Sequence, residues 1–111
     1  MVGDSTLLEI ALTVYVDRLA EWGWKPQGVA VPSCHLFTDS LDLAELHDIA
    51  ARIGMRRVWF HNKESAPHYD LTAERRSAAV ALGAIELDWH NSVRVWKARR
   101  AALAASTPAV G

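Results

Sequence analysis

The amino-acid sequence predicts a small α/β domain in which an open, partly parallel sheet of about four strands is covered by about three helices. Its 111 residues match the usual size of one domain, so residues 1–111 are expected to share a single core. Short apolar segments typical of strands alternate with longer segments that carry apolar residues at helical spacing. Glycine and proline stand at the boundaries between them, as expected for connections.

The predicted strands are short segments rich in apolar, β-branched and aromatic residues. Pro32 limits regular pairing of the second strand to the residues that follow it. Because strands alternate with helices, at least two strands are expected to pair in parallel. The four segments are residues 12–16, 33–37, 57–60 and 84–87.

The predicted helices begin at capping residues and end at glycine. Asp39 or Ser40 can cap the first helix, and Gly54 can end it. Thr72 can cap the second, which Gly83 ends. The three helices are expected over residues 40–53, 73–82 and 91–104.

Composition limits the classes of partner and the compartment. The net charge of −1 argues against nucleic acid or anionic lipid as the general partner. The lone Cys34 cannot form an internal disulfide and is expected to be a small buried residue. With no targeting pattern and no long apolar run, the sequence predicts a cytoplasmic protein without a membrane segment. The last helix carries a basic set that is expected to form a solvated face, with nucleic-acid binding as an alternative: Arg94, Lys97, Arg99 and Arg100.

Polar side chains stand where predicted strands end or the second helix begins. Asp17, Asp39 and His61 each follow a predicted strand, and residues 68–70 directly precede a helix. Ligands of open α/β sheets bind at the carboxyl ends of strands. These side chains are therefore expected to converge.

Two histidines and a carboxylate form the candidate metal site, whose cofactor would be a divalent ion. Imidazole and carboxylate together suit zinc, manganese or iron, and the candidate ligands are His35, His68 and Asp70. Their spacing matches no established zinc motif, and His35 can equally be a hydrogen-bonded inward histidine. His47 is expected on a helix surface.

The run His68-Tyr69-Asp70 is the main candidate for acid–base chemistry. In that hypothesis His35 and His68 move protons, and Asp70 or Asp39 orients an imidazole. The alternative is a structural loop in which Tyr69 anchors the core and Asp70 caps the helix.

A ligand with negative charge is suggested by Arg75 and Arg76, because cations are unfavourable in the first turns of a helix. The alternative for these arginines is an ion pair with Asp39 or Glu86. Trp59 can stack on a base or sugar, although most of the five tryptophans are expected in the core.

Several short motifs occur in order along the chain. They are V-Y-V-D at 14–17, C-H-L at 34–36 with Asp39, E-L-H at 45–47, I-G at 53–54, W-F at 59–60, H-Y-D at 68–70, R-R at 75–76 and G-A at 83–84. Together they resemble domain-of-unknown-function family 4031, a family of small bacterial and phage proteins. The resemblance covers about residues 13–86, and it implies a fold and a biological setting but no reaction, substrate or cofactor.

Some segments of this chain match the family pattern position by position, and others depart from it. The segment before Leu12 and the helix at about 91–104 look like additions to the family core. The connection containing Trp22 and Trp24 departs from the family pattern, so the resemblance implies nothing about that side of a pocket. The matching positions are Asp17, His35, Asp39, His47, Trp59, His68, Tyr69, Asp70, Arg75 and Arg76.

The leading functional hypothesis is a site for a phosphorylated or nucleotide-like small molecule, with hydrolase-type acid–base or metal-assisted chemistry. Whether the protein is an enzyme stays open at this point. The alternative is a non-enzymatic module that binds a host protein, or a second copy of itself, through exposed Trp22 and Trp24.

Overall fold

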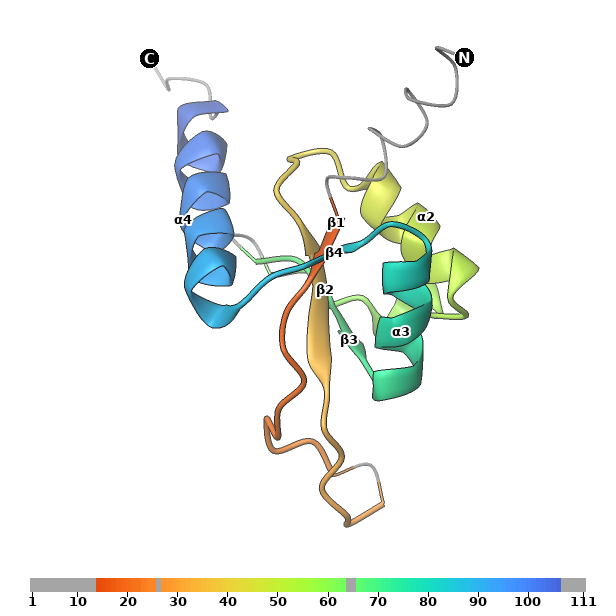
Figure 1. The fold of residues 1–111 in the computed structure, drawn as a ribbon. Coiled ribbons are helices and arrows are strands. Elements are labelled where there is room, and N and C mark those ends of the chain that lie inside the picture. The colour runs from red at the N-terminus through yellow and green to blue at the C-terminus, as the bar shows by residue number, and fades with distance from the viewer. Residues whose placement is uncertain (1–13, 26, 64–65, 107–111) are drawn as a thin grey trace.

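A computed structural model describes residues 14–25, 27–63 and 66–106, which fold into an α/β domain (Figure 1). Residues 12 and 13 of the first predicted strand lie outside the described residues. The elements are β1 (Val14–Val16), β2 (Cys34–Thr38), α2 (Ala44–Arg52), the 3-10 helix η1 (Arg57–Trp59), β3 (Tyr69–Leu71), α3 (Ala73–Ala81), β4 (Ile85–Glu86) and α4 (Trp89–Ser106).

The four strands form one sheet in the order β3-β2-β1-β4. Strand β1 pairs in parallel with β4, whereas β2 is antiparallel to both β1 and β3. The prediction of a partly parallel four-stranded sheet is therefore confirmed. The antiparallel middle pair places the end of β1 beside the start of β2.

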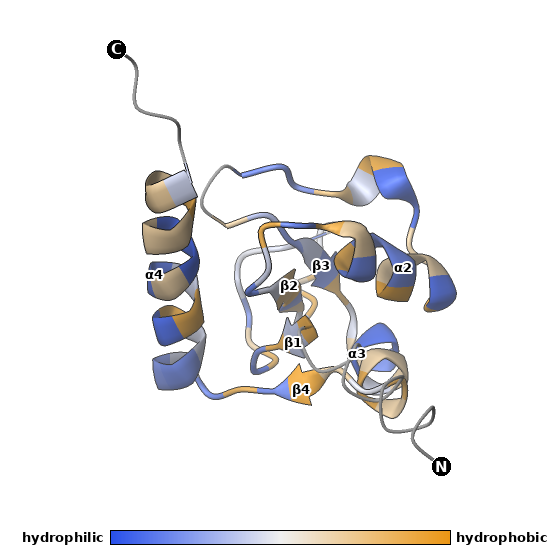
Figure 2. Cartoon of the chain, turned by 90° about the horizontal axis from the view of Figure 1, so that it is seen from above, coloured by the Kyte–Doolittle hydropathy of each residue, from blue (hydrophilic) through white to orange (hydrophobic). Residues whose placement is uncertain are grey.

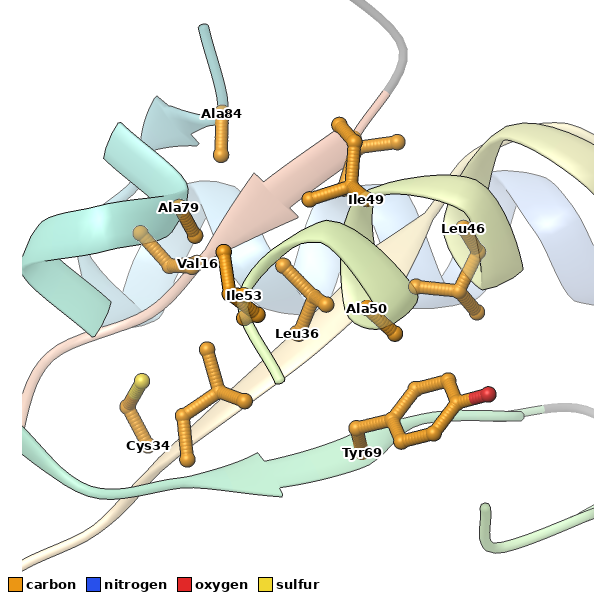
Figure 3. Close-up of a cluster of buried hydrophobic side chains, with 12 residues drawn as sticks. Val16, Cys34, Leu36, Leu46, Ile49, Ala50, Ile53, Tyr69, Ala79 and Ala84 are labelled. Carbon is orange, nitrogen blue, oxygen red and sulfur yellow. The ribbon is translucent and has the colours of Figure 1, made fainter. Parts of the chain in front are cut away.

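Helices lie on both sides of the sheet, with α2 and α3 on one side and α4 on the other (Figure 2). Side chains alternate along β2, so Cys34 and Leu36 are fully buried in the core beneath α2 and α3 (Figure 3). His35 and Phe37 point to the opposite face. Phe37 stacks on Trp96 of α4, with ring centroids 4.3 Å apart, whereas His35 retains a partly exposed side chain.

Helix α2 forms because its apolar residues recur at helical spacing and Leu46, Ile49 and Ala50 reach the core. It begins later than expected, at Ala44, whose backbone N–H donates to the Asp42 carboxylate. The prediction of a cap at Asp39 or Ser40 was therefore wrong. The positive φ of Gly54, +86°, follows the helix and fits the predicted stop.

Two short segments differ from prediction. Residues 57–59 form a 3-10 helix with Val58 and Trp59 exposed, rather than a strand of the sheet. Tyr69–Leu71, predicted as part of a loop, is the strand β3. The apolar-polar-apolar order of Tyr69, Asp70 and Leu71 fits a strand with one buried face, because side chains alternate with a period of two.

The tryptophans correct another expectation. Four of the five are exposed, so most do not form the core. The expectation that Arg99 is a solvated cation is also wrong, because Arg99 is 4% exposed and its Nε donates to the Ser40 carbonyl. Cys34 is buried as expected, and burial raises its pKa to about 12. No helix in the described ranges is both long and apolar enough to cross a bilayer.

Candidate metal centre and adjoining cavity

The candidate centre is built on the face of the sheet opposite α2 and α3. Asp17 directly follows β1, and its backbone N–H donates to the carbonyl of His35 on β2 at 3.3 Å. Asp70 on β3 is the direct cross-strand partner of His35. Directly opposite residues of an antiparallel pair place their side chains on the same face. The sheet register thus brings residues 17, 35 and 70 together.

Asp17 fixes the orientation of His35 through two short contacts. The backbone N–H of His35 donates to Asp17 Oδ1 at 2.6 Å, and His35 Nδ1 lies 2.6 Å from Asp17 Oδ2. Asp17 is only 2% exposed. Since an ionised carboxylate can only accept, Nδ1 of His35 carries the proton and donates it. In the neutral ring, Nε2 is then left with a free lone pair.

The Nδ1 atom of His68, like that of His35, is held by a hydrogen bond, but its partner is a backbone carbonyl. This Nδ1 atom lies 2.8 Å from the carbonyl oxygen of Ala66, which can only accept. The backbone is held by two hydrogen bonds with His61, one in each direction, at 2.9 and 3.1 Å. Nε2 of neutral His68 is therefore also a free acceptor.

These two Nε2 atoms face the same carboxylate oxygen. His68 Nε2 lies 3.5 Å from Asp70 Oδ1, and His35 Nε2 lies 3.9 Å from it. One ligand atom from each of the three residues lies within 4.8 Å of the others. Ligands of a tetrahedral zinc ion are about 3.4 Å apart, given metal–ligand distances of about 2.0–2.2 Å, so the three atoms would have to move together by up to about 1.4 Å to hold such an ion.

His61 completes the polar cluster from the exposed side. Its Nε2 lies 2.9 Å from Asp70 Oδ2, whereas the distances of 3.5 and 3.9 Å to the other two histidines are measured from Oδ1. Its ring stacks on that of His68 at 4.9 Å between centroids. His61 thus holds the Asp70 carboxylate in place.

Burial and charge act in opposite directions on the two inner histidines. For His35, burial lowers the pKa, but the hydrogen bond and charge of Asp17 and the charge of Asp70 outweigh it and raise the pKa overall. For His68, burial dominates and lowers the pKa, and the neighbouring His35 and His61 add to the lowering. Of these two imidazoles, His35 is therefore the more basic in the metal-free protein.

Asp17→Asn is expected to lower the pKa of His35 in the metal-free protein, because Asp17 supplies two of its raising contributions. A raised folded-state pKa stabilises the fold below about pH 6.5, and this contribution is lost as pH rises through the folded-state value. The stability deficit of the variant should thus be larger at about pH 5.5 than at about pH 8. NMR titration of the imidazole and urea unfolding at both pH values measure this. An unchanged His35 midpoint would contradict the assigned role of Asp17.

A cavity of about 520 Å³ adjoins the outer side of the centre. Its lining includes Asp70 and His61 of the centre together with Trp59 and Arg75. The guanidinium of Arg75 lies over the Trp59 ring, 5.4 Å from its centroid. A smaller cavity of about 310 Å³ is lined by Asp17, Arg18, Trp22 and Trp89.

Three predicted site residues lie elsewhere. Asp39 follows the far end of β2, on the order of 13 Å along the strand from His35, and accepts a hydrogen bond from the Tyr15 hydroxyl at 2.8 Å. The hypothesis that Asp39 orients an imidazole of the centre is therefore wrong. It fails because β2 runs antiparallel to β1, which puts the carboxyl ends of these strands at opposite edges.

Tyr69 and Arg76 make structural contacts instead. The Tyr69 ring is buried in the core, and its hydroxyl is hydrogen-bonded to His47 Nδ1 at 2.8 Å (Figure 3). Arg76 pairs with Glu86 at 2.9 Å and donates from Nε to the Asp17 carbonyl. The ion pair with Glu86 is the alternative that the sequence had left open.

Two residues of the cluster, Asp17 and His61, were not among the predicted ligands. Their positions after predicted strands were the available signal in the sequence. Their partners could not be named without the sheet register, because Asp17 lies 18 residues from His35. The two-way backbone pairing of His61 with His68 is likewise a property of the folded loop.

Comparison with known proteins places the chain in a family. A family model described as protein of unknown function (DUF4031) matches residues 14–99, which includes the whole sheet and extends into α4. No significant match was found among curated proteins or among solved structures. With well over half of its residues matched, the chain belongs to the DUF4031 family.

Proposed function

We propose that this protein binds a divalent metal ion through His35, His68 and Asp70 and uses it for hydrolase-type chemistry on a phosphorylated or nucleotide-like small molecule. The observation that carries the proposal is the pair of oriented imidazoles. Asp17 and the Ala66 carbonyl each accept a hydrogen bond from an Nδ1–H, so both Nε2 lone pairs face one carboxylate oxygen. Metal-binding histidines are oriented in this way, by a carboxylate or carbonyl on the other ring nitrogen.

A purely structural role explains this arrangement less well. Two neutral Nε2 atoms and a carboxylate are all acceptors, so they leave no hydrogen bond among themselves unless a proton is added. The separations of 3.5 and 3.9 Å are long for such bonds. A cation shared by the three atoms satisfies them together.

A bound divalent ion with an open position supplies a Lewis acid and lowers the pKa of a coordinated water toward neutrality. The side chains of the site would hold the ion and bind the substrate. His35, His68 and Asp70 hold the ion, and His61 holds the outer oxygen of Asp70. Arg75 at the wall of the adjoining cavity would bind an anionic group of the substrate.

Zinc titration of the wild-type protein tests this function. We expect one site by calorimetry, and zinc at 100 times its Kd should stabilise the fold by about 2.7 kcal/mol, raising Tm by roughly 10 °C. His68→Ala should weaken zinc binding at least about tenfold. His90→Ala removes an exposed histidine of α4 and is the matched control, which should bind zinc like wild type.

Two outcomes would contradict the proposal. One is the absence of binding by zinc, manganese or iron(II) to the folded wild-type protein. The other is an equal loss of affinity in His68→Ala and His90→Ala, which would mean that the ion binds elsewhere.

A second candidate function is a protein-interaction module, which the exposure of Trp22 and Trp24 favours, at 46% and 39%. Large exposed aromatic side chains are frequent anchors of interfaces. A second copy of this chain is the partner most readily tested. Concentration-dependent dimerisation in sedimentation experiments, lost in Trp22→Ala, would support this function, and a monomer at all concentrations would remove self-association.

A further inference from the structure

The cavity beside Asp70 has aromatic walls contributed by separate segments of the chain. Trp24 comes from the connection between β1 and β2, whereas Trp59 and Phe60 come from η1 and the residue after it. Trp24 is 39% exposed and Trp59 is 41% exposed, so both indoles retain surface that a ligand can cover. Planar rings of nucleobases stack on such side chains with little dependence on the base.

The segment carrying Trp24 is held in place by backbone pairing. Ala20 and Ser33 exchange two hydrogen bonds, at 2.9 and 3.0 Å, and the N–H of Val31 donates to the Trp24 carbonyl at 3.0 Å. These bonds close the connection into an extension of the β1–β2 pair. The wall formed by Trp24 is therefore part of the ordered fold.

The charge of the cavity suits one phosphate group. Among the described residues that line it, Arg75 carries the one guanidinium or ammonium group, and no described carboxylate lies within ion-pair distance of it. A divalent ion on Asp70 leaves a net charge of about +1, and Arg75 on the cavity wall adds a second positive charge, which suits the charge of about −1.5 to −2 of a phosphate monoester. Arg56 adds further positive charge nearby, because its guanidinium also lies over the Trp59 ring, 5.8 Å from the centroid. The negative charge of a triphosphate would exceed the positive charge of the cavity.

From these observations we infer that the substrate is a mononucleotide-sized phosphate monoester, with its planar ring between Trp24 and Trp59 and its phosphate between Arg75 and the metal centre. The volume of about 520 Å³ lies within the range of small-molecule sites. This inference rests on the proposed metal function, because the ion supplies the positive charge beside Asp70.

Calorimetric titration of the zinc-loaded full chain, with excess zinc removed, tests the inference with four probes: AMP, adenosine, ribose 5-phosphate and ATP. AMP should bind at least about tenfold more tightly than adenosine or ribose 5-phosphate, since each lacks one of the two recognised groups. ATP should bind no more tightly than AMP. Ribose 5-phosphate binding as tightly as AMP would overturn the inference.

Two variants test recognition of the ring and recognition of the phosphate separately. Trp24→Ala should weaken AMP about tenfold and leave ribose 5-phosphate unchanged, whereas Arg75→Gln should weaken both phosphates and leave adenosine unchanged. Trp89→Ala removes an exposed indole outside this cavity and should bind all probes like wild type. Equal losses for AMP and ribose 5-phosphate in Trp24→Ala would overturn the assignment of the ring.

Zinc binding measured in the absence of nucleotide distinguishes failure of the metal proposal from failure of the substrate proposal. If zinc binds at one site and no probe binds, the substrate assignment is wrong and the metal function stands. If zinc does not bind, the metal function is wrong, and AMP binding to the metal-free protein would then assign the cavity to a non-catalytic receptor for nucleotides.

Discussion

Asp70→Ala is expected to reduce zinc affinity by about 100-fold or more, the largest functional effect of any single substitution in the chain. Asp70 is the only carboxylate of the three ligands, so its removal takes away both a ligand atom and the negative charge that attracts the ion. The oxygen that faces His35 and His68 is lost together with the partner of His61. Competition with a chromophoric zinc chelator measures the change.

The variant should remain folded, because the Asp70 side chain is 39% exposed and its backbone pairing with His35 is unaffected. Asp48→Ala is the matched control, since it removes a surface carboxylate that pairs with Arg52 one helical turn away. Wild-type zinc affinity in a folded Asp70→Ala protein would exclude Asp70 as a ligand.

Tyr69→Ala is expected to cost about 3–5 kcal/mol of folding free energy, a large share of the total stability of a small domain. The ring is 1% exposed and contacts Phe60 at 5.2 Å between centroids, and its hydroxyl is hydrogen-bonded to His47. Truncation would leave a cavity in the core and an imidazole without its partner. Urea unfolding measures the loss.

Tyr69→Phe separates the packing from the hydroxyl and also tests the position of Tyr69 relative to the centre. It keeps the ring and should cost only about 1 kcal/mol. The side chains of Tyr69 and Asp70 point to opposite faces of β3. The zinc affinity of the Tyr69→Phe variant should therefore equal that of wild type. A zinc affinity that falls as far as that of Asp70→Ala would place the Tyr69 hydroxyl in the centre.

Elements with a clear local sequence pattern could be predicted from the sequence. The apolar spacing of α2, the Thr72 cap of α3 and the β-branched residues of β1 and β2 predicted the α/β class. Strand β3 was missed because three residues give too short an alternation to outweigh a capping signal directly after it. Trp59 and Phe60 suggested a strand, but their segment has no partner in the sheet and forms a 3-10 turn.

The residue types of the candidate centre could be named from sequence, but their arrangement could not. His35, His68 and Asp70 were chosen for ligand chemistry, and the cross-strand pairing of residues 35 and 70 supplies their proximity. Asp39 was misassigned because parallel strands were assumed where β1 and β2 are antiparallel. The direction of a strand depends on contacts distant in sequence, so no local pattern encodes it.

A crystal structure of the zinc-soaked protein, with anomalous scattering recorded at the zinc edge, tests the central claim most directly. We expect one strong peak about 2.0–2.2 Å from Nε2 of His35, Nε2 of His68 and a carboxylate oxygen of Asp70, with Nδ1 of His35 still bonded to Asp17. A peak on His47 or His90 alone, or no peak in a well-ordered centre, would show that the three residues do not form a metal site.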